Sequence, residues 1–113
     1  IPNHHEMIGF QSDIGMMGNV SIWGALYDES RRRKFLTNVS NPTQKATNLN
    51  SWNEFRIRAE GDVITIWING ALATRYFENA SESKIPRNGR FGLQIHSGPP
   101  AEAWYKDIQI KEL

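Results

Sequence analysis

The sequence predicts an all-β protein, an antiparallel β-sandwich or jelly roll. Three observations support this prediction. The clearest segments are short runs in which apolar and polar side chains alternate, as they do along a β-strand. No segment keeps the 3.6-residue period of a helix for long enough to form one. The pair Asn69-Gly70 joins two alternating runs and is a strong hairpin signal.

Composition narrows the classes of function. The chain has 113 residues, enough for one domain, and its net charge of +1 gives no reason to expect nucleic acid or an anionic membrane as a partner. It contains no cysteine, so disulfides and thiolate metal sites are excluded. No apolar run approaches the roughly 18 residues of a membrane-spanning helix, and no membrane insertion is expected.

The N-terminal part is predicted to be extended, with glycine turns between its strands. A regular strand over residues 9–14 places Gly9, Gln11 and Asp13 on one face. The glycines of the GMMGN run that follows predict a turn. The next run, VSIWGALY, favours a strand in which Gly24 marks a bulge or a close approach of backbone.

Two polar stretches come next. Residues 28–34, DESRRRK, form a charge run in which we expect Arg32, Arg33 and Lys34 to make a solvated turn. Residues 37–51 are rich in Asn, Thr and Ser and show no periodicity, which predicts a long loop. Long loops inside compact domains are often functional.

The strongest strand signal lies in residues 52–76. Alternation predicts strands in the runs NEFRIRAE and VITIWING, with a Glu-Gly-Asp turn between them. With the returning strand after the Asn-Gly turn, they form a three-stranded antiparallel meander. Its middle strand is expected to turn Ile64, Ile66 and Ile68 toward the core. Trp67 then faces the opposite side.

Residues 90–113 predict a second hairpin, with a Ser-Gly-Pro-Pro loop between its strands. In the first strand Gln94 and His96 share a polar face. The opposite, apolar face is expected to join the core and consists of Phe91, Leu93 and Ile95. In the second strand, the alternation of Tyr105 is out of phase with that of Ile108 and Ile110, and a bulge near residues 106–107 would account for the change.

Several of these runs resemble one family. WNEFRIRAEGDVITIWING, GRFGLQIHSGPPAEAWYKDIQIKEL, IPNHHEMIGFQSDIG and GALYDESRR are similar to the bacterial 3-keto-disaccharide hydrolase family, whose fold is a concanavalin A-like jelly roll. The family domain is longer than this chain. The resemblance therefore implies that residues 1–113 are the C-terminal part of a single jelly-roll domain, incomplete at its N-terminus. The missing part, or a self-associated copy, would cover an exposed core face.

The resemblance also implies a function, an enzyme that cleaves 3-keto-glycosides or 3-keto-disaccharides as a hydrolase or lyase. In a 3-keto sugar the ketone acidifies the proton on C2, so a base can form an enolate that expels the C1 substituent. This route needs a base, a stabiliser for the enolate oxygen and a proton donor for the leaving group. A periplasmic or secreted location is expected for the parent protein. The alternative is a non-catalytic, lectin-like carbohydrate-binding module.

Three residues are candidates for the chemistry. His96 is the first candidate for base or acid, since the ordinary pKa of histidine is about 6.5. Asp13 is the alternative base. Arg31 offers charged donors for the keto or enolate oxygen. The structural alternatives are a histidine that only bonds a loop, an ordinary polar outer face at Asp13, and a solvated charged turn at Arg31.

Further residues are candidates for binding the sugar or a metal. The candidates for substrate binding are Gln11, Gln94, Tyr27, Asp28, Glu29, Trp23 and Trp67. Aromatic rings such as those of Trp23 and Trp67 suit the apolar faces of sugars. A divalent metal ion would stabilise an enolate, and His5 and Glu6 are weak ligand candidates because their spacing is not a zinc signature.

Overall fold

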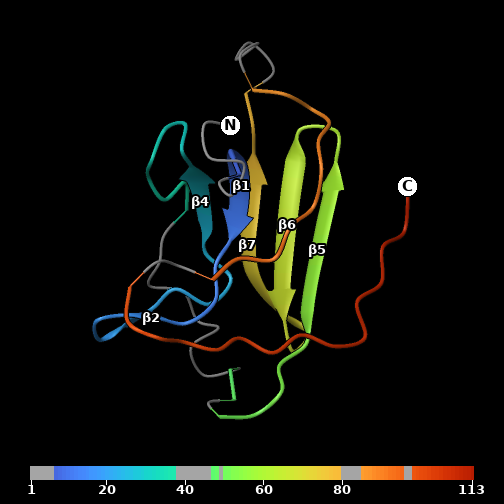
Figure 1. Ribbon diagram of the computed structural model, residues 1–113. Helices are drawn as coiled ribbons and strands as arrows, with labels where there is room; N and C mark the ends of the chain where they lie inside the picture. Colours follow the sequence, from blue (N-terminus) through green and yellow to red (C-terminus); the bar gives the residue numbers. More distant parts are fainter. Residues whose placement is uncertain (1–6, 38–46, 49, 80–84, 96–97) are drawn as a thin grey trace.

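The computed structural model describes residues 7–37, 47–48, 50–79, 85–95 and 98–113 (Figure 1). These residues form seven β-strands and no helix, which confirms the all-β prediction. Within the same ranges, no helix has the length and apolar character to cross a membrane.

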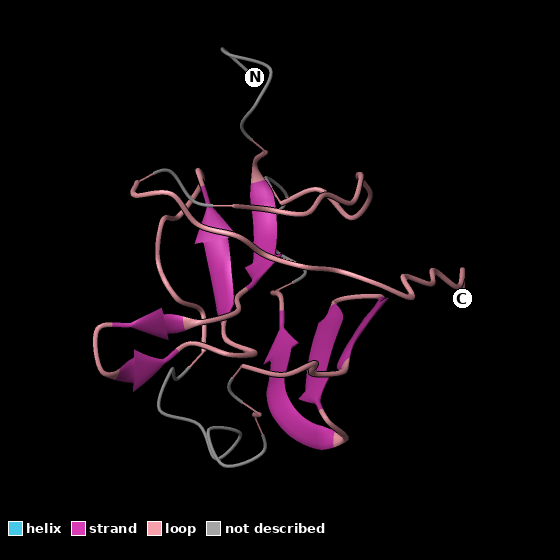
Figure 2. Ribbon diagram, turned by 60° about the horizontal axis from the view of Figure 1, so that its bottom comes forward, coloured by secondary structure: helices cyan, strands magenta, loops and turns pink. Residues whose placement is uncertain are grey.

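The strands belong to three antiparallel sheets. The first pairs β1 with β4, the second is the short hairpin β2–β3, and the third has the order β5-β6-β7. The bounds of the strands are β1 Gly9–Ser12, β2 Met16–Met17, β3 Val20–Ser21, β4 Leu26–Glu29, β5 Phe55–Glu60, β6 Val63–Ile68 and β7 Ala71–Phe77. The β2–β3 hairpin, at the predicted glycine turn, projects from one side of the molecule in both views (Figures 1 and 2).

The three-stranded meander is confirmed. β5 pairs with β6 from Phe55 opposite Ile68 to Glu60 opposite Val63, and β7 returns along the other side of β6. At the β6–β7 turn, Asn69 and Gly70 have φ values of 50° and 82°. Two successive positive φ angles match the twist of a two-residue hairpin, which is why Asn-Gly is the favoured pair there.

The core lies between the meander and the β1–β4 sheet. Ile66 and Ile68 of β6 are completely buried, as the alternation predicts, and they are joined by Leu26 of β4 and by Ala25 just before it. The ring centres of Phe10 in β1 and Tyr76 in β7 lie 6.4 Å apart where the two sheets meet. The burial of each Leu or Ile side chain here contributes about 1.5–3 kcal/mol to folding.

Gly24 lies between β3 and β4, which divide the single strand expected there, and permits a close contact with the meander, one of the two alternatives that the sequence left open. Its φ is +77°, and a Cβ added to it would lie 2.5 Å from the Cβ of Ala73 and 3.0 Å from Cδ1 of Ile68. The Thr74 hydroxyl donates a 2.8 Å hydrogen bond to the Gly24 carbonyl across the same seam. The backbone can approach this closely only because glycine has no side chain.

The predicted C-terminal hairpin is wrong. No strand is found in residues 85–95 or 98–113 of the structure, and the segment crosses the molecule without joining a sheet (Figure 1). Phe91, Leu93 and Ile95 are 82%, 61% and 59% exposed instead of lying in the core. The expected bulge is likewise absent from any ladder. Alternation indicates which side chains share a face, but a strand also needs a neighbour with free backbone groups.

Substitution of Gly24 tests the close contact between the two sheets. Gly24→Ala and Gly70→Ala each place a side chain on a backbone with positive φ, at +77° and +82°, but only the first meets other atoms within 4 Å. We therefore expect Gly24→Ala to lose roughly 1–3 kcal/mol more unfolding free energy than Gly70→Ala, in urea titrations of both variants. Equal losses would show that the close approach is not needed.

Candidate functional site

One face of the β1–β4 sheet carries four of the predicted site residues. Gln11 lies directly opposite Tyr27, and Gly9 lies opposite Glu29. The side chains of Gln11, Tyr27 and Glu29 therefore share a face. Asp13 follows β1 immediately and its side chain bonds that of Gln11. The structure thus brings Gln11, Asp13, Tyr27 and Glu29 together, of which the alternation predicted only the shared face of Gln11 and Asp13.

Asp13 is the carboxylate at the centre of this group. It is 7% exposed, and the Gln11 amide donates a hydrogen bond to its Oδ1. Its backbone is fixed by two 2.9 Å hydrogen bonds, one to the Ala25 carbonyl and one from the Gly24 amide. The close contact at Gly24 therefore also holds Asp13, the candidate base, in position.

Burial raises the pKa of Asp13 from 3.8 to about 6. The hydrogen bond from Gln11 opposes this rise, and the negative charge of Glu29 adds to it. A carboxylate with this pKa is mostly ionised at neutral pH, yet more basic than an exposed one. That combination suits a group that removes a proton from carbon.

Asp28 and Arg31 lie on the other side of the same strand pair. Asp28 is fully buried, and its Oδ1 accepts a 2.6 Å hydrogen bond from Nε of Arg31. The Arg31 guanidinium carbon also lies 4.8 Å from the centre of the Phe10 ring. These two candidates therefore face the core and bind each other, away from Asp13.

The prediction of a solvated turn is wrong for Arg32. Its Nη1 and Nη2 lie 3.2 Å and 2.5 Å from the two carboxylate oxygens of Glu78, and its Nε bonds Asp28. Glu78 itself is 3% exposed, so the carboxylate of this ion pair is buried, and the pair joins the segments that follow β4 and β7. The charge run could not show this, because Glu78 is 46 residues away in the sequence.

The arginines control the ionisation of this cluster. Hydrogen bonds from Arg32 lower the pKa of Glu78, against the effect of burial. Burial acts to raise the pKa of Asp28, but hydrogen bonds from Arg32 and Arg31 outweigh it and hold that pKa below its ordinary value. The pKa of Arg32 is raised by the same contacts. Asp28, Arg32 and Glu78 thus form a charged clamp, a structural feature of the sandwich.

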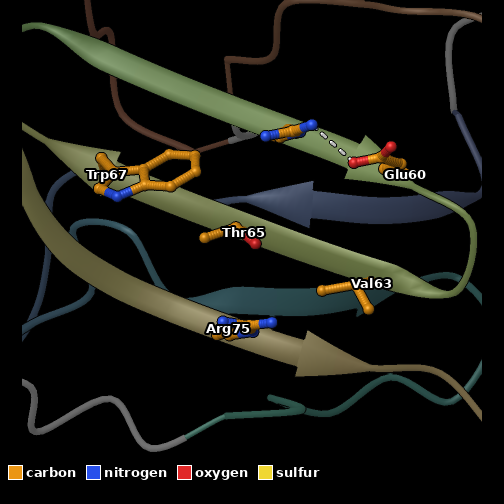
Figure 3. Close-up of a pocket in the computed structure, with 6 residues that line it drawn as sticks. Glu60, Val63, Thr65, Trp67 and Arg75 are labelled. Carbon is orange, nitrogen blue, oxygen red and sulfur yellow. Dashed lines mark ion pairs between the residues drawn. The ribbon is translucent and has the colours of Figure 1, made fainter. Parts of the chain in front are cut away.

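The outer face of the meander contains an open pocket of about 280 Å³ (Figure 3). Trp67, Thr65 and Val63 follow one another along β6, and Arg75 projects from the neighbouring strand in the same view. The complete lining is Arg58, Glu60, Val63, Thr65, Trp67 and Arg75. The sequence predicted the outward direction of Trp67 but not the arginines around it, although the same alternation places them on that face.

A family model matches nearly the whole chain. The model of the 3-keto-alpha-glucoside-1,2-lyase-like domain matches residues 2–111. The chain belongs to this family. No curated protein and no solved structure matches it. The resemblance found in the sequence is thereby confirmed, while the assignment of residues 1–113 to the C-terminal part of the domain stays a prediction.

The other site candidates of this lyase-like domain are dispersed. Trp23 packs against the Phe55 ring, with the ring centres 6.3 Å apart. Gln94 lies on the exposed C-terminal segment, where its backbone carbonyl accepts a hydrogen bond from the Tyr105 hydroxyl at 3.3 Å. Trp67 lines the pocket on the outer face of the meander and not the face that carries Asp13.

Three candidates lie outside the described residues, namely His96, His5 and Glu6. Their roles as acid or base and as metal ligands stay predictions. Among the residues that the structure describes, no three His, Asp or Glu side chains are grouped so that they could hold a metal ion.

Loss of the charged clamp should destabilise this lyase-like domain. We expect Arg32→Ala to lose roughly 3 kcal/mol of unfolding free energy near pH 7, because Asp28 and Glu78 stay buried without their main partner. Lys34→Ala, which removes an exposed cation from the same run, should stay within about 0.5 kcal/mol of the wild type. Both carboxyl pKa values are lowered in the fold, so the difference should shrink as the pH falls below their ordinary values of 3.8 and 4.5. A constant difference would contradict the ionic origin.

Asp13 gives the opposite pH dependence. Its pKa is higher in the folded chain than the ordinary 3.8, so its ionisation destabilises the fold as the pH rises from 3.8 through about 6. Asp13→Asn should therefore be about 1–3 kcal/mol more stable than the wild type at pH 7.5 and equally stable at pH 3.5, in urea titrations. Asp107→Asn, at an exposed position, should show no such change between the two pH values. A less stable Asp13→Asn at pH 7.5 would contradict the raised pKa.

Proposed function

We propose that this domain eliminates the C1 substituent of 3-keto-glycosides, with Asp13 as the base that removes the C2 proton. The raised pKa of the buried Asp13 carboxylate is the observation that carries the proposal. The name of the matching family, 3-keto-alpha-glucoside-1,2-lyase-like domain, describes elimination across C1 and C2 of such a sugar.

The reaction proceeds in two electron shifts. The base takes the C2 proton, and the electrons of the C–H bond form an enolate between C2 and C3. The enolate then restores the C3 carbonyl, a double bond forms between C1 and C2, and the C1 oxygen leaves with its electron pair. The leaving oxygen takes a proton and departs as an alcohol. Water that adds to C1 afterwards would give net hydrolysis.

The neighbours of Asp13 support this assignment. Gln11 fixes the direction of the carboxylate through its side-chain hydrogen bond. Tyr27, on the same face, offers a hydroxyl group that can donate a proton to the leaving oxygen or a hydrogen bond to the enolate. Arg31 is occupied by Asp28 on the inner face, so we leave it out of the reacting groups. His96, which the sequence predicts as a base or an acid, would serve as the acid in this assignment.

The proposal is tested with a chromogenic 3-keto-α-glucoside. The wild-type chain should release the aglycone and form a 1,2-unsaturated 3-keto sugar, with a rate that rises through about pH 6 as Asp13 ionises. Asp13→Asn should lower kcat by about 10²–10⁴-fold, the range expected for the loss of a general base. Exchange of the C2 proton with deuterated water, followed by NMR, reports the first step alone.

Two results separate this activity from simple binding. A non-catalytic carbohydrate-binding module would bind the sugar without exchange at C2, and Asp13→Asn would leave the affinity unchanged. Release by Asp13→Asn at the wild-type rate would transfer the role of base to another group. No release by the wild type, with or without a divalent metal ion, would rule out the proposed reaction for this chain.

A further inference from the structure

The outer face of the meander has a row of residues that the proposed reaction does not use. Arg58 of β5, Thr65 of β6 and Arg75 of β7 lie directly opposite one another across the three strands. Neighbouring strands are about 4.8 Å apart, so the two arginine backbones are separated by about 10 Å. Arginine side chains are long enough for both to reach one group bound above Thr65, beside which Arg75 lies in Figure 3.

The charge of this row is not balanced. Arg58 forms a 2.7 Å ion pair with Glu60, but both side chains are about half exposed, and such pairs contribute little. Arg75 has no carboxylate partner among the residues that the structure describes. Arg56 extends the positive surface, with its guanidinium carbon 5.1 Å from the centre of the Trp67 ring. The face therefore presents more positive than negative charge around a pocket.

We propose that this pocket binds a saccharide that carries a carboxylate or a sulfate ester. The guanidinium groups of Arg58 and Arg75 hold the anionic substituent, because planar arginine donors match two oxygens of such a group. The Thr65 hydroxyl lies between them and donates a further hydrogen bond. Trp67, two positions along β6, offers a flat ring for the apolar face of the sugar.

The size of the pocket favours a saccharide over a longer polyanion. A volume of about 280 Å³ is near the lower end of small-molecule sites and suits a short saccharide. Nucleic acid needs a broader basic surface, while the net charge of this chain is only +1. The pocket opens on the face of the meander opposite the core and is lined by none of the residues around Asp13. Binding here is therefore independent of the proposed elimination.

Isothermal titration calorimetry of the whole chain tests the proposal with four probes, a galacturonic acid trisaccharide, a sulfated disaccharide, neutral maltotriose and a single-stranded oligonucleotide. We expect the uronate or the sulfated sugar to bind at least tenfold more tightly than maltotriose, and added salt to weaken that binding. Whichever of the two anionic sugars binds more tightly identifies the substituent. Equal affinity for maltotriose, or tighter binding of the oligonucleotide, would overturn the proposal.

Two substitutions should act in opposite directions. Arg75→Gln should weaken binding of the anionic sugar by roughly tenfold or more, since it removes a charged donor. Glu60→Gln should strengthen binding, since it removes a competing carboxylate and releases Arg58. Arg90→Gln, an exposed arginine outside the pocket, is the matched control and should change nothing. If Glu60→Gln weakens binding, or Arg75→Gln leaves it unchanged, the assignment of the site is wrong.

These outcomes are distinguishable from those of the elimination. Asp13→Asn should keep the affinity for the anionic sugar, and Arg75→Gln should keep C2 proton exchange with a neutral 3-keto-glucoside. Thermal unfolding of each variant confirms that the fold is retained. Loss of anion binding in Asp13→Asn would show that the two sites are one, and would overturn the independence stated above.

Discussion

The contact between Arg32 and two buried carboxylates holds the rest of the structure together. Asp28 comes from β4 and Glu78 follows β7, so one guanidinium bonds both sheets of the sandwich. Because all three charges are largely withdrawn from water, each must be paired. The described core has few fully buried apolar side chains, and this polar clamp supplements it.

The position of the clamp decides which surfaces remain for function. Asp28 and Glu78 occupy the inner faces, and Gly24 lets the sheets approach beside them. The outer face of β1–β4 then carries Asp13 with Gln11, and the outer face of the meander carries Trp67 among arginines. The two polar surfaces therefore lie on opposite sides of the core. The proposed acid–base chemistry and the proposed binding of an anionic sugar use different residues.

Strands could be predicted from alternation where the pairing strand was also nearby in the sequence. The meander is such a case, because its three strands follow one another and the Asn69-Gly70 turn sets their register. The direction of Trp67 and the grouping of Gln11 with Asp13 came from the same pattern. The alternation of residues 90–95 was equally clear, yet no neighbouring strand pairs with them in the structure, so Leu93 and Ile95 stay exposed.

The amino-acid sequence by itself determined the all-β class, the family, and the inner and outer positions of the meander, since these depend on local periodicity and on residue identity. Only the tertiary structure decided that Arg32 pairs with Glu78 and that Asp13 is buried enough to raise its pKa. The physical reason is that ionisation depends on all the charges and on the water around a group. Those neighbours come from segments far apart in the chain, and only folding brings them together.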